Sequence, residues 1–181
     1  MPKIVAIVGM TGSGKSELTA FLVNRGWHKV RFGDLTEEEL RRRRLAQTSE
    51  TERIVREDLR QKHGMAVFAT LNLGRVEEAL QKGNVVIDGL YSWAEYMAMK
   101  KKYADNLVII AVSAAPKTRY TRLASRAVRP LRTDEAQTRD HAEIEHIQKA
   151  GPIAMADYTI VNEGSMEELN RQCEEILSKI G

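Results

Sequence analysis

Cysteine is nearly missing from this chain of 181 residues, and other absences narrow its class further. The single cysteine, Cys173, excludes a disulfide bond within the chain and is typical of a reducing compartment. No apolar run approaches the roughly 20 residues of a membrane-spanning helix. The first residues resemble a strand rather than a signal peptide. We therefore predict a cytoplasmic protein that does not associate with membranes.

Metal-ligand patterns are also lacking. The four histidines have no ligand spacing, and His141 and His146 are five positions apart, on different faces of a helix. We therefore predict no structural metal. The net charge of +3 suits an anionic substrate without requiring nucleic acid, and the length fits one domain, residues 1–181.

One motif is complete, the sequence G-x-x-x-x-G-K-S over residues 9–16, here called the phosphate loop. An apolar, strand-like run precedes it at residues 3–8, and a helical pattern follows it at residues 17–24. Strand, glycine loop and helix together direct backbone N–H groups at a polyphosphate. We predict that ATP binds here with Mg²⁺, that Lys15 reaches the β- and γ-phosphates, and that the Ser16 hydroxyl ligates Mg²⁺. The predicted nucleotide-binding residues of this region are Gly9, Thr11, Gly12, Ser13, Gly14, Lys15, Ser16 and Glu17.

Apolar runs alternate with helical patterns along the rest of the chain, which indicates a parallel sheet covered on both faces. A long polar helical region runs from about 36 to 82, with breaks near Ser49, where Ser49 and Glu52 form a capping-box pattern, and at Gly64. Ligands of such sheets bind beyond the carboxyl ends of the strands. The predicted strands are residues 3–8, 29–32, 85–87, 107–112 and 158–161.

Two motifs of other phosphate-loop proteins are missing. The chain has no Asn-Lys-x-Asp guanine reader of GTPases and no Leu-Ser-Gly-Gly signature of transporter ATPases. It has instead a polar insert at about 35–82 and an arginine-rich segment at about 120–149, which we call the lid. A charged lid that closes over two small molecules excludes water from the γ-phosphate, so these features favour a small-molecule kinase.

Two aspartates follow predicted strands and are candidate catalytic residues. Asp34 is placed to orient or deprotonate an acceptor hydroxyl, and the alternative is that it caps the following helix. Asp88 is placed to support Mg²⁺, and the alternative is an ordinary Asp-Gly turn with Gly89.

Arginines of the lid are the candidates for stabilising the transferred phosphoryl group, because a guanidinium fork matches phosphate oxygens. Arg122 and Arg126 are four apart on one predicted helical face, and Arg139 lies in the next helix. Any one of these three could instead be surface charge. Residues 37–44 are best explained as a solvated helix with three i,i+4 ion pairs, and the alternative is that an insert arginine, among them Arg53, Arg56 or Arg60, binds an acceptor phosphate.

The C-terminal half resembles the dephospho-CoA kinases and the archaeal proteins related to adenylate kinase. The resemblance rests on residues 119–126, on Arg139-Asp140, and on residues 156–169, which are similar to the pattern Ala-Asp-x-x-Ile-x-Asn-x-Gly-x-x-x-Glu-Leu. It implies an α/β P-loop NTPase fold of the nucleoside monophosphate kinase type, in three layers, with a five-stranded parallel sheet. It also implies a core of residues 1–34, 83–119 and 150–181, an acceptor-binding insert and a lid. Asn162 and Gly164 would then lie against the adenine.

The resemblance implies transfer of the γ-phosphoryl group of ATP to the ribose 3′-hydroxyl of dephospho-CoA. A nucleoside monophosphate is the alternative acceptor, since Asp34 stands alone where dephospho-CoA kinases have two aspartates. A regulatory NTPase with a protein or RNA partner is a third hypothesis, although nucleic acid is the less expected partner. We expect a monomer or a small homo-oligomer.

Overall fold

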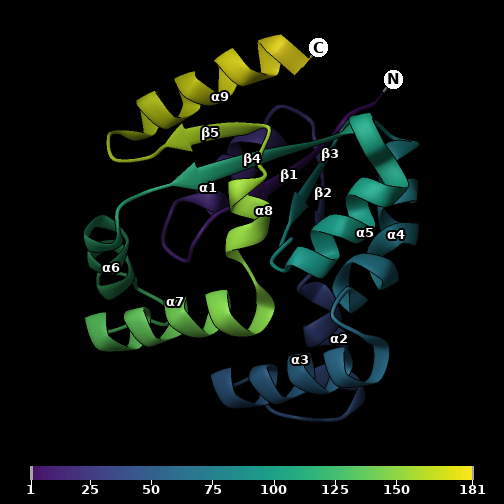
Figure 1. Cartoon of the computed structure of the whole chain (residues 1–181), viewed down its shortest axis with the longest axis vertical. Helices are drawn as coiled ribbons and strands as arrows, with labels where there is room; N and C mark the ends of the chain where they lie inside the picture. Colours follow the sequence, from purple (N-terminus) through teal and green to yellow (C-terminus); the bar gives the residue numbers. More distant parts are fainter. Residues whose placement is uncertain (1, 181) are drawn as a thin grey trace.

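The computed structural model describes residues 2–180, in which five parallel strands form one sheet between two layers of helices (Figure 1). The strand order is β2-β3-β1-β4-β5, so the strand before the phosphate loop is central. All four pairings are parallel, with Ile7 opposite Asp88 in β3 and Ile110 in β4. The predicted three-layer fold is confirmed. The strands are β1 (Ile4–Val8), β2 (His28–Arg31), β3 (Val85–Asp88), β4 (Leu107–Ser113) and β5 (Tyr158–Val161).

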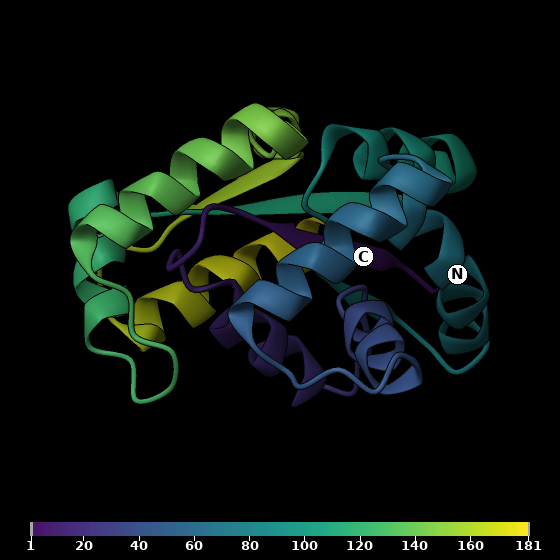
Figure 2. The same ribbon diagram turned by 90° about the horizontal axis from the view of Figure 1, so that it is seen from below.

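The helices fill the predicted gaps between strands. The polar region before β3 is three helices, α2 (Asp34–Arg42), α3 (Ser49–His63) and α4 (Val67–Leu80). Figure 2 shows these helices on one side of the molecule and the lid helix α7 on the other. The remaining helices are α1 (Lys15–Val23), α5 (Trp93–Tyr103), α6 (Pro116–Ala124), α7 (Thr133–Ile147), α8 (Ala150–Ala154) and α9 (Met166–Ile180), with a 3₁₀ turn, η1, at Ala104–Asn106.

Two apolar clusters, one on each face, hold the sheet. One cluster packs α1 and α9 on the sheet, and Cys173 is buried in it, which agrees with a packing role for this side chain. The other joins the sheet to α4, α5 and the inner sides of α2 and α3. All five residues of β1 are buried, as expected of a central parallel strand.

Local capping differs from the prediction in one place. The N-cap of α3 is Thr48 rather than Ser49, and Thr48 and Thr51 exchange the two hydrogen bonds of the capping box. Ser49-to-Glu52 was the wrong register by one residue, because a threonine at the third helical position serves as well as a glutamate here. In the described part of the chain, no helix is long and apolar enough to cross a membrane.

Candidate functional site: the phosphate loop and the helix that covers it

The phosphate loop connects β1 to α1 and needs its glycines. Gly9, Gly12 and Gly14 have φ angles of 146°, 85° and 106°, a region that side chains rarely adopt. A Cβ on Gly12 would lie 2.9 Å from the carbonyl oxygen of Arg119, so the loop also packs too closely for a side chain. The first N–H groups of α1 have no acceptor within the helix, and they are available to a phosphate.

Lys15 begins α1, and its ammonium group donates to the carbonyl oxygen of Met10 at 3.0 Å. Burial and then the nearby ammonium of Lys149 lower the pKa of Lys15 to about 7. Asp88 and Glu143 act in the opposite direction and keep the shift from being larger. The site therefore has a deficit of negative charge at the position where Lys15 would meet a phosphate.

Asn162, which follows β5, is hydrogen-bonded to the backbone of the phosphate loop. Its buried side-chain amide donates to the carbonyl oxygen of Ser13 at 2.7 Å. A Cβ on Gly14 would collide with the same amide group, so the two residues are packed face to face. Gly164, also predicted at the nucleotide, is exposed in the loop that precedes α9. Asn162 thus touches the loop itself, and the predicted contact of both residues with adenine stays a prediction.

Glu143 on α7 joins the lid to the phosphate loop. Its carboxylate accepts from the Thr11 hydroxyl at 3.1 Å, from Lys149 Nζ at 2.6 Å and from Arg139 Nε at 2.9 Å. Burial alone would raise the pKa of this carboxyl group, but Lys149 and Arg139 hold it at about 2. The Lys149 ammonium is almost fully buried and lies 4.7 Å from the centre of the Tyr91 ring. Lys149 and Glu143 thus form a largely buried ion pair at the edge of the phosphate loop.

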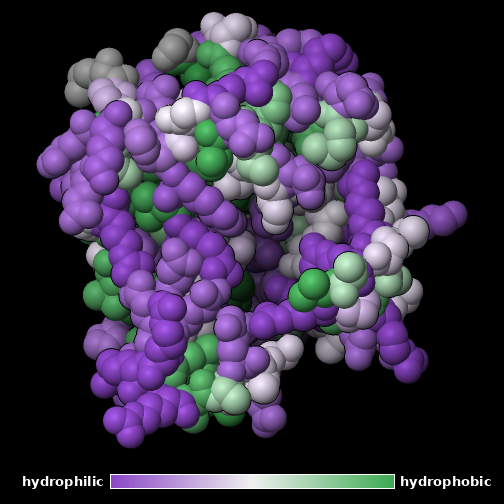
Figure 3. Space-filling model, turned by 180° about the vertical axis from the view of Figure 1, so that it is seen from behind, coloured by the Kyte–Doolittle hydropathy of each residue, from purple (hydrophilic) through white to green (hydrophobic). Residues whose placement is uncertain are grey.

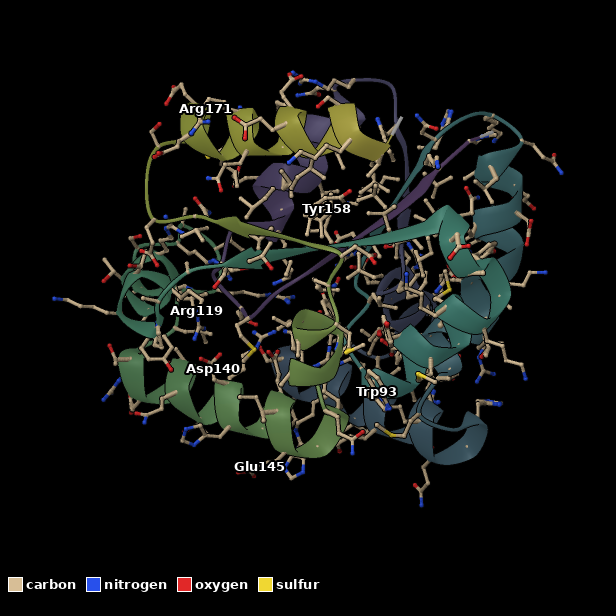
Figure 4. All side chains as sticks on the ribbon, turned by 45° about the horizontal axis from the view of Figure 1, so that its top comes forward. Trp93, Arg119, Asp140, Glu145, Tyr158 and Arg171 are labelled. Carbon is tan, nitrogen blue, oxygen red and sulfur yellow. The ribbon has the colours of Figure 1, made fainter. Side chains whose placement is uncertain are left out.

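Arg119 and Asp140 make a second connection between the same parts. Arg119 on α6 binds Asp140 on α7 through two hydrogen bonds, of 3.1 and 2.6 Å, and both side chains are buried. The same guanidinium donates to the carbonyl oxygens of Thr11 and Ala114. Figure 4 shows Arg119 and Asp140 pointing toward each other between the two helices. This pair fixes α7 over the loop through neutralised charges.

The three lid arginines occupy different environments. Arg139 is half exposed and paired with Glu143, beside the phosphate loop. Arg122 is half-buried on α6, and its Nη1 atom is buried without a hydrogen-bond partner. Arg126 is exposed and lies beyond the end of α6 at Ala124. The expectation that Arg122 and Arg126 share one helical face is therefore wrong, because the helix stops two residues earlier.

The two candidate aspartates also lie apart. Asp88 ends β3 beside β1, its carboxylate is 3.2 Å from Lys29 Nζ, and it is close enough to Lys15 to raise the pKa of that lysine. The following Gly89 has a φ of 105°, so the Asp-Gly turn is present as well. Asp34 is the first residue of α2, not its N-cap, and accepts from Arg31 at 2.9 Å. It lines a hollow of about 260 Å³ beside β2 to which no phosphate-loop residue contributes.

A magnesium ion bound with a nucleotide needs only one or two protein oxygens, because phosphates and water supply the others. Ser16 is exposed at the start of α1, and Asp88 provides a carboxylate near Lys15. Within residues 2–180, no three acidic, histidine or cysteine side chains gather as a metal site. The donors present fit a hard cation shared with phosphate oxygens. Glu17 is exposed beside Ser16, and its predicted contact with the nucleotide stays a prediction.

Sequence reasoning missed four of the residues that shape this site. Glu143 and Lys149 stand in a polar stretch with no periodic signal, and Arg119 and Asp140 carry the family resemblance without a predicted role in the site. One signal could have indicated Arg119, since it is four positions before the buried Leu123 and therefore on the inner face of α6. Viewed from behind, the mostly hydrophilic surface is hollowed near its centre (Figure 3).

Comparison with known proteins gives sequence relatives over the whole chain. The profile of a family described as AAA domain matches residues 5–145. A UPF0200 protein of Thermococcus gammatolerans is 35% identical, over 98% of this chain and 95% of the relative. A UPF0200 protein of Thermococcus kodakarensis is 36% identical, over 98% and 97%.

Solved structures with the same fold include sugar and shikimate kinases. TT1252 from Thermus thermophilus superimposes with a TM-score of 0.64 at 23% identity, over 99% of this chain and 98% of the other. A shikimate kinase from Bacteroides thetaiotaomicron gives 0.62 at 18% identity, over 97% and 98%. A gluconokinase from Sinorhizobium meliloti gives 0.61 at 14%, over 99% and 93%. At these identities the likeness concerns the fold.

Proposed function

Because this chain belongs to the UPF0200 family and has the fold of the P-loop kinases, we propose that it is an ATP-dependent kinase of a small molecule. The observation that carries the proposal is the pair of contacts that hold α7 over the phosphate loop, Thr11 to Glu143 and Arg119 to Asp140. A covered loop protects a γ-phosphate from water. A transferase needs this protection, whereas a simple hydrolase does not.

In the proposed transfer, the residues around the phosphate loop have separate roles. Lys15 and the N–H groups at the start of α1 neutralise charge on the γ-phosphoryl group while it moves. An acceptor oxygen forms the new bond to phosphorus as the bond to the β–γ bridging oxygen breaks, and ADP leaves. A phosphate acceptor attacks through an oxygen that is already deprotonated, whereas a hydroxyl acceptor would also release its proton to the solvent. Mg²⁺, held by Ser16 and Asp88, would supply further neutralisation of the phosphate oxygens when bound. Arg139, which pairs with Glu143 beside the loop, would stabilise negative charge on the transferred group in the transition state.

The acceptor is proposed from two candidates, dephospho-CoA and a nucleoside monophosphate. The C-terminal pattern that resembles dephospho-CoA kinases has structural tasks in this fold: the Asp157 carboxylate accepts from the backbone of Ile109, and Asn162 holds the phosphate loop. The first contact stabilises the sheet, and the second stabilises the loop where the nucleotide would bind; neither lies in the insert. The pattern therefore supports the kinase proposal more than it supports a particular acceptor, which the insert must select.

The test is a coupled assay of ADP release with ATP and Mg²⁺, run against dephospho-CoA, the common nucleoside monophosphates, shikimate and gluconate. We expect slow release without acceptor and strong stimulation by one compound. Lys15→Ala should remove the stimulation, whereas Lys179→Ala, an exposed change near the C-terminal end of α9, should leave it intact. Stimulation only by RNA or a protein would instead support a regulatory NTPase. Stimulation retained by Lys15→Ala would refute the site.

A further inference from the structure

Arg56 and Arg60 lie one turn apart on α3 and make no hydrogen bond to any side chain in the described part of the protein. Their nearest carboxylates are Glu52, 3.6 Å from Arg56, and Glu95, 3.9 Å from Arg60. Other arginines of the insert are hydrogen-bonded to carboxylates, namely Arg42, Arg43, Arg53 and Arg75. Arg41 and Arg44 also lack such a bond, but both are exposed to water, whereas Arg56 and Arg60 are partly buried.

The Arg60 side chain is largely withdrawn from water, and that of Arg56 is withdrawn in part. The Arg60 side chain is 13% exposed and that of Arg56 is 38% exposed, compared with 59% for Arg53 on the same helix. Arg60 Nε is buried without an acceptor. Burial lowers the pKa of both arginines, and the neighbouring carboxylates offset this only in part. Charges that have lost part of their hydration and have only a long ion pair in return are costly in the free protein.

The position of the pair connects it to the phosphate loop. Arg56 is close enough to α7 to interact electrostatically with Arg139 and Glu143, and Glu143 in turn accepts from Thr11. Arg60 stands 5.1 Å from the centre of the Phe68 ring and near the start of α5, just after β3. The two cations therefore face the space between the insert and the carboxyl ends of the central strands, where a second substrate would meet the γ-phosphate.

Glu95 attracts the Arg60 guanidinium without accepting a hydrogen bond from it. One oxygen of this buried carboxylate accepts from the backbone N–H groups of Tyr91 and Ser92, and the other, Oε1, has no hydrogen-bond partner. Oε1 lies on the side of Arg60 at a distance that attracts the guanidinium but does not bind it. Arg60 is thereby positioned with its N–H groups available to a ligand.

We propose that Arg56 and Arg60 bind a phosphate group of the acceptor. Two guanidinium groups on one helical face match a doubly charged phosphate better than a carboxylate, which neutralises only one of them. This inference rests on the proposed function and narrows it to acceptors that already carry phosphate. Shikimate-like and gluconate-like acceptors, which carry a carboxylate, are thereby disfavoured.

The test measures anion binding after the phosphate loop is filled. The protein is saturated with Mg²⁺ and a non-hydrolysable ATP analogue, then titrated at pH 8 with inorganic phosphate and, separately, with acetate by calorimetry. We expect phosphate to bind more tightly than acetate. Arg56→Gln and Arg60→Gln should each weaken phosphate binding by about tenfold, as loss of a charge-assisted hydrogen bond implies. Arg53→Gln, the matched control on the same helix, should change it less than twofold.

Binding of the ATP analogue to each variant shows that it is folded. The inference is overturned if phosphate binds no better than acetate, or if Arg53→Gln weakens binding as much as the other two changes. Failure of the wild-type protein to bind the analogue would count against the kinase proposal instead. The anion site would then be measured in Lys15→Met protein, in which the phosphate loop has lost its cation, and Arg56→Gln should still weaken phosphate binding.

Discussion

The carboxylate of Asp140 binds the guanidinium of Arg119 through two hydrogen bonds at a point where both side chains are buried, and Arg119 continues to the backbone of the phosphate loop. One side chain thus connects α6, α7 and the loop. Together with the contacts of Glu143, this charge pair attaches the lid to the core, and its contribution depends on both partners being present.

Removal of one partner of this pair should destabilise the protein. Asp140→Asn leaves the Arg119 charge buried without compensation, and we expect the free energy of unfolding in urea to fall by about 3 kcal/mol. The control is Arg171→Gln, which breaks an exposed ion pair on α9 and should cost less than about 0.5 kcal/mol. Equal effects of the two changes would mean that the buried pair has no special weight.

The pKa of Lys15 predicts that nucleotide binding takes up a proton. In the free protein this pKa is about 7, so the Lys15 side chain is largely a neutral amine at pH 8. A bound triphosphate would raise the pKa and so protonate the amine. Affinity should therefore weaken as the pH rises above 7. Calorimetry at pH 8, in buffers that differ in ionisation enthalpy, should show uptake of nearly one proton.

Lys15→Arg separates this effect from the charge itself, since arginine stays protonated throughout this range. Its nucleotide binding should show little proton uptake at pH 8. Uptake that is the same in wild-type and Lys15→Arg protein would assign the proton to another group.

Glu143 predicts a loss of stability in acid. Its pKa is about 2 in the folded protein and near 4.5 in the unfolded chain, so its contribution is complete above 4.5 and is lost as the pH falls toward 2. Glu143→Gln should reduce the dependence of the unfolding free energy on pH across this window. Glu57→Gln, an exposed change on α3, should reproduce the wild-type slope, and a matching slope for Glu143→Gln would contradict the assignment.

Asn162 predicts a loss of nucleotide affinity from a change outside the motif. Asn162→Ala leaves the Ser13 carbonyl oxygen without its buried donor, a penalty of about 1–3 kcal/mol. We expect binding of a Mg²⁺-bound ATP analogue to weaken by about tenfold, with the far-UV circular dichroism unchanged. Thr159→Ala, an exposed change on β5, the strand that precedes Asn162, should bind the analogue normally. Normal binding by Asn162→Ala would show that the loop holds its shape unaided.

The sequence predicted the parts of the fold that local patterns determine. Buried parallel strands are continuous apolar runs, and the phosphate loop has a fixed spacing, so the five-stranded sheet and the loop could be located. Pairing on the surface could not. Of the three expected i,i+4 pairs in α2, Glu39 binds Arg43, whereas Glu38 binds Arg75 of α4. Glu37 binds Arg31. Which ion pairs form depends on residues that the fold brings together from other elements, and local sequence spacing does not predict those neighbours.

The candidate site was predicted in the same uneven way. Lys15 and Asn162 belong to motifs, and both lie at the phosphate loop. Glu143 on α7 and Lys149, two residues beyond the end of this helix, are ordinary polar residues until the chain folds over the loop and removes them from most of the solvent. Their importance arises from long-range packing, which has no period in the sequence. For the same reason the sequence could not separate Arg56 and Arg60 from the paired arginines around them.

The contact between Asn162 and Ser13 joins residues that are 149 positions apart, and it has a consequence for the order in which the protein is made. A ribosome completes the phosphate loop long before it reaches β5. During that interval the loop lacks the amide that supports it, and β1 lacks the strands beside it. The nascent chain therefore carries its binding motif well before it acquires a competent binding site, because that site needs Asn162 and the neighbouring strands.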